Sequence, residues 1–326
     1  MLYPLKFKPL YKEYIWGGRN LAKYKRNLPE TNIAESWEIS CHPDGESIVD
    51  NGEYKGQSLN EVIARYKRGI IGAELPIEYI YKFPLLIKLI DANNKLSVQV
   101  HPDDQYAKNT GCSDYGKNEM WYILEAKPGA RIVHDIKQGT TKEAFADAIE
   151  KGNVEACLNY VYVESGDTVN IPAGTVHALG EGIVLVEIQQ NSNLTYRVYD
   201  YNRVDKNGNK RELHIDKALD VINFDSKKSI CKISPISVSV NKDFIKTDLI
   251  SNKYFSVEKY DVNGKVFENA DGSKFFIYIV LDGECEMAYK NGREKIVKGE
   301  SVLVPAYTGY FSLNGKFQAL KTYVPK

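Results

Sequence analysis

The 326-residue sequence lacks net charge and long apolar runs. Lys and Arg together number 43, and so do Asp and Glu, which gives a formal net charge of zero. Nucleic-acid or membrane-surface binding through bulk electrostatics is therefore not expected, because both depend on a basic patch or domain. No apolar stretch approaches the roughly 20 residues that a membrane-spanning helix needs.

Cysteine is scarce and dispersed, with no CxxC spacing. We interpret each cysteine as a reduced, small buried hydrophobe rather than as part of a disulfide framework. The N-terminal sequence MLYPLKFKPLYKEYIWGG lacks the continuous apolar segment and small-residue cleavage site of a signal peptide. These absences predict a cytoplasmic protein. The cysteines are Cys41, Cys112, Cys157, Cys231 and Cys285.

Histidine is equally scarce, and none follows His214. Metal chemistry based on histidine must therefore belong to the first part of the chain. Tyrosine, by contrast, is abundant at 23 residues. Because tyrosine favours half-buried strand surfaces, this excess predicts a protein rich in β-sheet.

Short strand-like stretches dominate both halves of the chain. They are apolar or alternating and end at Gly, Pro, Asp or Asn, as in 95–100, 183–189 and 275–282. Two segments instead show helical spacing behind an N-cap residue, Ser58–Gly69 and Thr141–Leu158. We expect both to form short helices packed on the sheet structure of the N-terminal half.

Two similar segments indicate that one β fold occurs twice. Residues 163–175 read VESGDTVNIPAGT and residues 297–309 read VKGESVLVPAYTG. Each runs from Gly and an acidic residue through a strand to Pro-Ala and a turn, and such repetition is typical of duplicated folds. Residues 222–240 resemble a connection. We predict a mainly β protein with an N-terminal domain, 1–225, that carries the helices, and an all-β C-terminal domain, 226–326.

Four residues of the N-terminal half have metal-binding chemistry. Gln99 and His101 lie two apart in SVQVHP and project to the same side of a strand. A Pro-Ala-Gly turn directs His177 inward, and Glu119 opens an apolar strand, where a carboxylate is costly unless paired. Taken singly, each has an ordinary structural explanation, as a strand-end cap, a histidine bonded to a carbonyl or a solvated carboxylate.

Their combination favours a metal site. Two imidazoles, one carboxylate and one amide lie on successive strands, each beside a turn. This is an N and O ligand set that suits zinc with one position left open. No cysteine lies near these positions in the sequence, which excludes a sulfur-rich site. Of the other histidines, His42 and His134 look like turn residues, and His214 has no evident partner.

A second polar group of residues follows. Glu187 and Gln189 share one face of a strand, and Arg197 lies on the strand that returns. Arginine can hold a planar anion through its bidentate fork. The alternative is a structural ion pair between Glu187 and Arg197.

In these segments the chain resembles type I phosphomannose isomerases (mannose-6-phosphate isomerases) of the compact bacterial kind. The motifs occur in family order and at family-like spacing, and the resemblance covers nearly the whole chain. The matching segments are WGG (16–18), AESWEIS (34–40), QVHP (99–102), GKNE (116–119), PAGTVHA (172–178) and YRVYD (196–200).

The resemblance implies two cupin (jelly-roll) β-barrels, of which the first is catalytic and the second is metal-free. It implies one zinc ion per chain and a small-molecule sugar phosphate as the partner. The implied reaction is the interconversion of mannose 6-phosphate and fructose 6-phosphate. The implied zinc ligands are Gln99, His101, Glu119 and His177.

The resemblance also assigns catalytic roles. Arg197 occupies the position of the family's catalytic arginine, where it would stabilise the developing enediolate. Lys117 and Glu187 match positions of acid–base or substrate-contacting groups. Lys117 is a base if the neighbouring dication disfavours its charged form, and Glu187 is a base because a carboxylate is already ionised. The sequence leaves this choice open.

The chain departs from the longer members in two places. They carry Ser-Asp-Asn before the arginine, where this chain has Ser192-Asn193, and they carry a large helical insertion that is absent here. Phosphate-binding residues therefore cannot be transferred. Lys95, Lys108 and Arg203 are cations available for this role, without a choice among them.

Two other functions fit the same residues. An iron-dependent cupin dioxygenase would use two histidines and a carboxylate, and a sugar-binding cupin would need no turnover. A homodimer is an assembly that the sequence leaves open.

Overall fold

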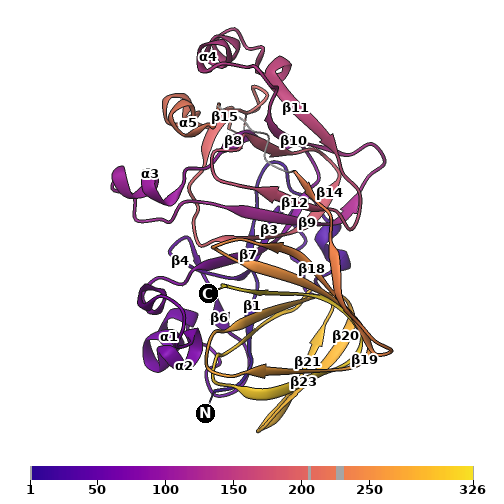
Figure 1. Ribbon diagram of the computed structural model, residues 1–326. Coiled ribbons are helices and arrows are strands. Elements are labelled where there is room, and N and C mark those ends of the chain that lie inside the picture. The colour runs from indigo at the N-terminus through magenta and orange to yellow at the C-terminus, as the bar shows by residue number, and fades with distance from the viewer. Residues whose placement is uncertain (1, 205–206, 225–230, 326) are drawn as a thin grey trace.

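A computed structural model of the chain describes residues 2–204, 207–224 and 231–325. Antiparallel strands dominate it, which confirms the mainly β class predicted from the sequence. Figure 1 shows one sheet assembly in the upper half of the view and another in the lower half. Within the described ranges each sheet runs from one edge strand to another instead of closing on itself, so two closed barrels are not seen. The predicted boundary at 225/226 falls on residues outside the described part.

A seven-stranded sheet lies at the centre of the molecule and is buried on both faces. Along one of its strands Val184 and Val186 face one core cluster, whereas Ile183 and Leu185 face another. Successive side chains of a strand point to opposite faces, so a continuous apolar run marks burial on both sides. In sheet order the strands are β16 (Lys232–Ile233), β12 (Thr168–Ile171), β9 (Glu119–Ala126), β14 (Ile183–Gln190), β7 (Leu85–Ala92), β3 (Glu35–Ile39) and β2 (Leu10–Lys12).

A five-stranded sheet packs over one face of the central sheet. Ile132 and Leu179 from this sheet meet Ile171 and Leu185 of the central sheet in one core cluster. In order its strands are β11 (Leu158–Tyr162), β10 (Arg131–Ile136), β13 (His177–Leu179), β8 (Val98–Val100) and β15 (Tyr196–Tyr199). The helices of this half are α3 (Asp104–Asn109), α4 (Lys142–Glu150), η3 (Val154–Cys157) and α5 (Ile215–Val221).

A nine-stranded sheet contains most of the C-terminal half, and the first strand of the chain joins it. Leu5 pairs with Leu303, so β1 lies between β22 and β6. In order the strands are β17 (Ile236–Val240), β18 (Phe244–Ser251), β19 (Ser256–Ala270), β23 (Gly309–Tyr323), β20 (Phe276–Tyr289), β22 (Ser301–Val304), β1 (Leu5–Lys8) and β6 (Ile48–Val49), with β21 (Gly292–Val297) paired to β20. A separate two-stranded sheet is formed by β4 (Cys41–His42) and β5 (Gly45–Glu46).

Both predicted helices are present and begin where their caps predict. Ser58 and Glu61 form a reciprocal capping box ahead of α1 (Leu59–Tyr66), and Thr141 caps α4. The second predicted helix is shorter than expected, because α4 ends at Glu150 and η3 follows separately. The remaining helices are α2 (Arg68–Ile71), η1 (Asn20–Lys23) and η2 (Ile77–Ile80).

The helices do not all pack on the N-terminal sheets as expected. The backbone N–H groups of Ala306 and Tyr307 donate to the carbonyl groups of Ile70 and Gly69, which ties α2 to the C-terminal half. Figure 1 shows α1 and α2 beside the lower sheet and α4 and α5 at the opposite end. The α1–α2 pair therefore bridges the two halves.

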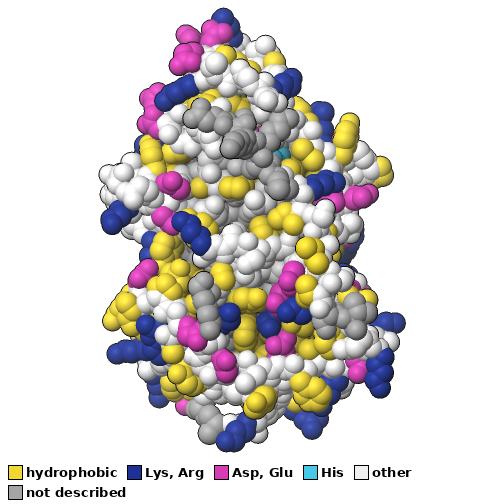
Figure 2. All heavy atoms as spheres, in the orientation of Figure 1, with side chains coloured by type: hydrophobic (Ala, Val, Ile, Leu, Met, Phe, Trp, Pro, Cys, Tyr) yellow, Lys and Arg dark blue, Asp and Glu magenta, His cyan; other side chains and the backbone are white. Residues whose placement is uncertain are grey.

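The surface of the described residues has no large region of one charge on the face shown. In Figure 2 cationic and anionic side chains are interspersed over the visible face.

All five cysteines are free thiols, as expected. Cys112, Cys157 and Cys231 are only partly buried, so the expectation of buried thiols is wrong for these three. No helix of the described ranges is both long and apolar enough to cross a membrane.

Candidate metal centre

The residues with metal-binding chemistry meet between the five-stranded and seven-stranded sheets. His101 directly follows β8 and His177 begins β13, whereas Glu119 begins β9 of the opposing sheet. Gln99 of β8 lies directly opposite His177 across the strand pair. Residues distant in sequence thus converge because two sheets pack face to face.

The ligand atoms lie close together and away from solvent. Nε2 of His101 is 3.3 Å from one carboxylate oxygen of Glu119, and Nε2 of His177 is 3.5 Å from the other. All candidate atoms of the three residues lie within 4.8 Å of one another, and each residue is at most 1% exposed. The side-chain amide nitrogen of Gln99 is 3.3 Å from Nε2 of His177. Three potential metal-ligand atoms therefore face one buried point.

Protonation states at this point suit a metal ion. Burial, reinforced by the charge of Lys117, lowers the pKa of His101 to about 3, and burial lowers the pKa of His177 to about 4. Burial raises the pKa of Glu119, but Lys117 and the histidines outweigh it, so this pKa lies well below its usual value. Nδ1–H of His177 donates to the Thr175 carbonyl over 2.9 Å, which leaves Nε2 unprotonated and facing the side-chain amide of Gln99. Two neutral imidazoles and one carboxylate result.

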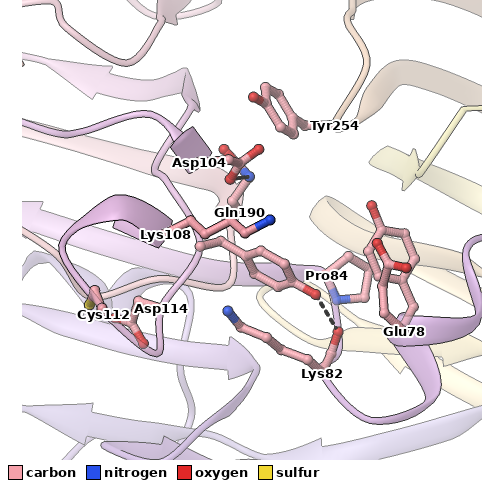
Figure 3. A pocket seen from close by; sticks show the side chains of 12 residues that line it. Glu78, Lys82, Pro84, Asp104, Lys108, Cys112, Asp114, Gln190 and Tyr254 are labelled. Carbon is pink, nitrogen blue, oxygen red and sulfur yellow. Dashed lines mark hydrogen bonds between the residues drawn. The ribbon is translucent and has the colours of Figure 1, made fainter. Parts of the chain in front are cut away.

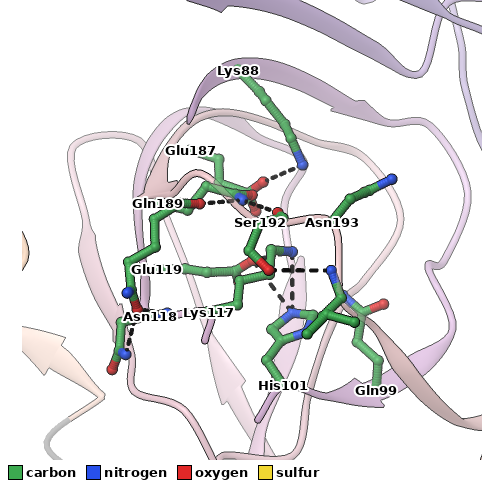
Figure 4. A network of polar contacts seen from close by, with 12 residues as sticks. Lys88, Gln99, His101, Lys117, Asn118, Glu119, Glu187, Gln189, Ser192 and Asn193 are labelled. Carbon is green, nitrogen blue, oxygen red and sulfur yellow. Dashed lines mark hydrogen bonds and ion pairs between the residues drawn. The ribbon is translucent and has the colours of Figure 1, made fainter. Parts of the chain in front are cut away.

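Lys117 supplies a positive charge at the same point. Its Nζ is 2.6 Å from Glu119 and 3.3 Å from Nε2 of His101. Figure 4 shows Lys117 between these two side chains. The three-residue cluster is therefore arranged around a cation, and the donor set fits a metal ion in that position.

Glu187 is held in place by partners from two neighbouring strands. Trp121 Nε1–H donates to one of its oxygens over 2.9 Å. Lys88 Nζ lies 3.0 Å from the other oxygen (Figure 4). Burial and the charge of Glu119 raise the pKa of Glu187, whereas Lys88 lowers it. The carboxylates of Glu187 and Glu35 raise the pKa of Lys88 against its burial, so this lysine is a fixed cation. The expected alternative, an ion pair between Glu187 and Arg197, is not what the structure shows.

Arg197 lies on β15, opposite Gln99 in the strand register. Its Nε donates to Ser97 Oγ over 3.2 Å, and one terminal nitrogen donates to the Glu212 carbonyl over 2.7 Å. Burial and the nearby Arg211 lower the pKa of Arg197 from its usual value. The guanidinium is therefore anchored by neutral oxygens and keeps its charge free for an anion.

A cavity of about 280 Å³ connects these groups and has a cationic excess. Gln99, Lys117, Glu187 and Arg197, all singled out from the sequence, line it. The three-residue cluster of His101, Glu119 and His177 lies behind this lining. Four cations and two anions face the cavity: Lys88, Lys117, Arg197, Arg211, Glu35 and Glu187.

Asn193 also lines the cavity, but its hydrogen bonds point outward. Its side-chain amide donates to Asp44 over 2.6 Å, and its backbone N–H donates to Asp114 over 3.0 Å. It therefore orders a loop at the cavity wall.

The other histidines are not members of the cluster, although His134 lies opposite His177 in the strand register. His42 contacts Asp114, and His134 bonds to the Asn170 carbonyl. His214 accepts the backbone N–H of Arg197.

Several cavity residues were missed by sequence reasoning. Lys88 interrupts the apolar run LLIKLI, and this signal was available because a charge in such a run needs a partner. Arg211 is the fourth cation of the cavity lining, but its position depends on a hydrogen bond to Asp200 that no local sequence pattern indicates. Lys95, Lys108 and Arg203, the cations considered for phosphate, do not line the cavity.

The sequence matches two family models. The family model described as "Phosphomannose isomerase type I, catalytic domain" matches residues 4–148. The family model described as "Mannose-6-phosphate isomerase, cupin domain" matches residues 245–324.

Individual proteins match over the full length. Mannose-6-phosphate isomerase ManA of Bacillus subtilis (strain 168) is 38% identical over 98% of this chain and 99% of its own length. The crystal structure of the mannose 6-phosphate isomerase from Bacillus subtilis is 34% identical, covers 98% of this chain and 99% of that chain, and has a TM-score of 0.88. A zinc-bound mannose 6-phosphate isomerase shares the fold at 17% identity and a TM-score of 0.78, over 99% of this chain and 100% of that chain.

Proposed function

This chain belongs to the type I phosphomannose isomerase family of enzymes, and from that premise we propose that it interconverts mannose 6-phosphate and fructose 6-phosphate with one bound zinc ion. The observation that carries the proposal is the convergence of His101, Glu119 and His177 on one buried point beside a cationic cavity. The reaction moves a proton between C1 and C2 and needs a base and a stabiliser of the enediolate.

Zinc is the metal that suits this donor set. His101, Glu119 and His177 would hold it through two imidazole nitrogens and a carboxylate oxygen, with Gln99 as the fourth protein ligand. Such sets with an open position are typical of catalytic zinc sites. When bound, the ion would polarise the sugar's carbonyl and hydroxyl oxygens. A relative of the same fold is a zinc-bound enzyme, which supports the choice.

Glu187 is the base that we favour of the two left open. Its carboxylate lines the cavity and is fixed by Trp121 and Lys88, so it presents one orientation to the substrate. A buried carboxylate with a raised pKa is a stronger base than a solvated one. Lys117 instead faces Glu119 at 2.6 Å, and we assign it to substrate contact beside the metal.

Arg197 stabilises the negative charge that develops on the enediolate oxygens, because a fixed guanidinium needs no rearrangement during the reaction. Arg211 faces the same cavity, and we assign this second guanidinium to the phosphate. An excess of cations in this cavity suits a dianionic substrate.

We also retain the two-unit organisation as a proposal, with a catalytic cupin domain at 1–225 and a metal-free cupin-like domain at 226–326. The second unit has an internal cation of its own, because the buried Lys321 Nζ lies 2.9 Å from Glu268. An ion pair there balances the internal charge without a metal. Cytoplasmic localisation and a homodimer remain predictions.

The test is an assay of purified protein for fructose 6-phosphate formed from mannose 6-phosphate. We expect activity to disappear with a chelator and to return with zinc. Absence of turnover with metal bound would reject this substrate pair. Iron in the site together with oxygen consumption would favour the dioxygenase instead.

A further inference from the structure

A second and larger cavity lies on the far side of the loop that leads to Lys117. Its volume is about 480 Å³, against about 280 Å³ for the catalytic cavity. It opens between α3, η2 and the residue Tyr254 just ahead of β19, so both halves of the chain contribute to it (Figure 3). No described residue lines both cavities. Volumes of this size are typical of small-molecule sites.

The charge of this cavity differs from that of the catalytic one. Two cations and three anions line it, namely Lys82, Lys108, Glu78, Asp104 and Asp114. A phosphate ester would meet more carboxylates than ammonium groups, whereas the catalytic cavity has the opposite balance. The second cavity therefore disfavours a phosphate ester or another anion.

A carboxylate and a cation of the cavity are held in fixed positions. One oxygen of Asp104 accepts the backbone N–H of Gly116 and the amide of Gln190, both over 2.9 Å. Lys82 donates to the Ser113 carbonyl over 2.6 Å and lies 3.6 Å above the ring of Tyr115. One carboxylate, Asp104, and one ammonium group, Lys82, are thus held in preformed positions at this wall.

Aromatic rings provide the apolar part of the wall. The rings of Tyr79 and Tyr115 meet edge to face at 6.5 Å, and Tyr254 and Pro84 complete this surface. A ligand that fits must have flat apolar faces and, at its edges, groups that both donate and accept hydrogen bonds. Hydroxyl groups do both, and tyrosine rings pack on apolar faces.

We propose that this cavity binds a neutral, unphosphorylated hexose or hexoside as a non-catalytic ligand. A pyranose ring has apolar faces and a rim of hydroxyls, and it has no charge to conflict with the carboxylates. The binding site is separate from the catalytic one and its occupancy does not depend on the proposed reaction, whereas the effect on turnover described next rests on the proposed function.

Hydrogen bonds connect this cavity to the catalytic strand. Gln190 lines the cavity, and its Oε1 accepts the backbone N–H of Asn118 over 3.0 Å and the Asn118 amide over 2.8 Å. Asn118 lies between Lys117 and Glu119. A ligand that competes for Gln190 would therefore act on the start of β9, so we expect binding to change turnover of mannose 6-phosphate.

The experiment uses the full chain with zinc and methyl α-D-mannopyranoside, which cannot open to an aldehyde and cannot be isomerised. Saturation-transfer NMR should show saturable binding, weakened at least about tenfold in Tyr254→Ala and also reduced in Glu78→Gln. The matched control is Tyr162→Ala, an exposed tyrosine of β11 that does not line the cavity, and it should bind normally.

Other outcomes would overturn the proposal. Absence of saturable binding, or equal binding by the Tyr254→Ala protein, removes the site. Loss of binding in Arg197→Ala would place the glycoside in the catalytic cavity. If glucose 6-phosphate bound this cavity more strongly than the glycoside and lost that binding in Tyr254→Ala, the proposal of a neutral ligand would be rejected. Unchanged turnover at saturating glycoside would reject the coupling through Gln190.

Discussion

At the scale of single residues, Lys88 links the metal centre to its surroundings. It is 3% exposed, and its Nζ lies 3.0 Å from Glu187 and 3.7 Å from Glu35. A buried ion pair of this kind gives little net stability, but removing one partner leaves an uncompensated charge. The lysine therefore keeps Glu187 ionised and in position.

Replacing Lys88 by methionine should move the acidic limb of the pH–kcat profile to higher pH. The ionised form of Glu187 is the active base, and loss of the ammonium raises the pKa of that carboxyl further. We also expect a loss of about 3–5 kcal/mol in the free energy of unfolding, because a buried carboxylate loses its partner. Kinetics across pH and urea denaturation measure the two effects.

Lys259→Met is the control for that variant, since Lys259 pairs with Asp261 in the nine-stranded sheet and lies outside the cavity. An acidic limb that stays in place in Lys88→Met would contradict the role given to Glu187.

Replacing Arg197 by alanine should lower kcat by about 10²–10³-fold while zinc content stays normal, because a fixed charge at the enediolate is lost and no metal ligand is touched. Metal analysis measures the zinc content, and the isomerase assay measures kcat. Arg293→Ala, at an exposed position of β21, should behave as wild type. Normal turnover in Arg197→Ala would exclude the proposed role.

Local patterns identify some site residues better than others. Gln99 lies in β8 and His101 directly follows this strand, so their closeness is local in the sequence. Glu119 and His177 meet only because two sheets pack face to face, and the prediction that they do so came from their ligand chemistry beside turns together with the family resemblance. Arg211 reaches the cavity through a loop held by Asp200, a contact between side chains that no spacing encodes.

At the scale of elements, the start of α1 rests on a reciprocal cap. Ser58 Oγ accepts the backbone N–H of Glu61, and the Glu61 carboxylate accepts that of Ser58. Ser58→Ala should lower the free energy of unfolding by about 1 kcal/mol, because an N-terminal donor loses its partner. Urea denaturation measures this loss. Asn60→Ala, an exposed position of the same helix, should change stability little, and equal losses in both variants would count against the cap.

Caps and turns are local, which is why both long helices were predicted at their first residues. The short helix α3 was missed because it has only six residues, of which only Ala107 is buried, so it shows no apolar periodicity. The place of β1 could not be predicted either. Its partner Leu303 is separated from Leu5 by nearly the whole chain, and pairing at such distance has no local signal.

At the scale of the whole molecule, the two halves share a core. One cluster contains Ile87 and Val186 from the central sheet together with Ile277, Leu303 and Leu320 from the nine-stranded sheet. Shared burial of this kind couples the halves during unfolding. The molecule should therefore unfold as one cooperative unit although its sequence repeats.

Leu303→Ala should destabilise both halves together. The side chain is fully buried, so truncation should cost about 2–5 kcal/mol. All three tryptophans, at 16, 37 and 121, lie in the first half, so their fluorescence reports that half alone. We expect the fluorescence and far-UV circular dichroism transitions to shift equally in urea. Tyr310→Ala, an exposed site, is the control, and a fluorescence transition unmoved by Leu303→Ala would contradict the coupling.

The pairing of β1 with β22 also sets an order of events during synthesis. A ribosome releases Leu5–Lys8 long before Ser301–Val304, the strand that covers one of its edges. Until then β1 has an open edge, and an open edge can pair with other chains. The nascent chain must therefore keep β1 from pairing elsewhere until β22 emerges, and the shared core is completed only after that point.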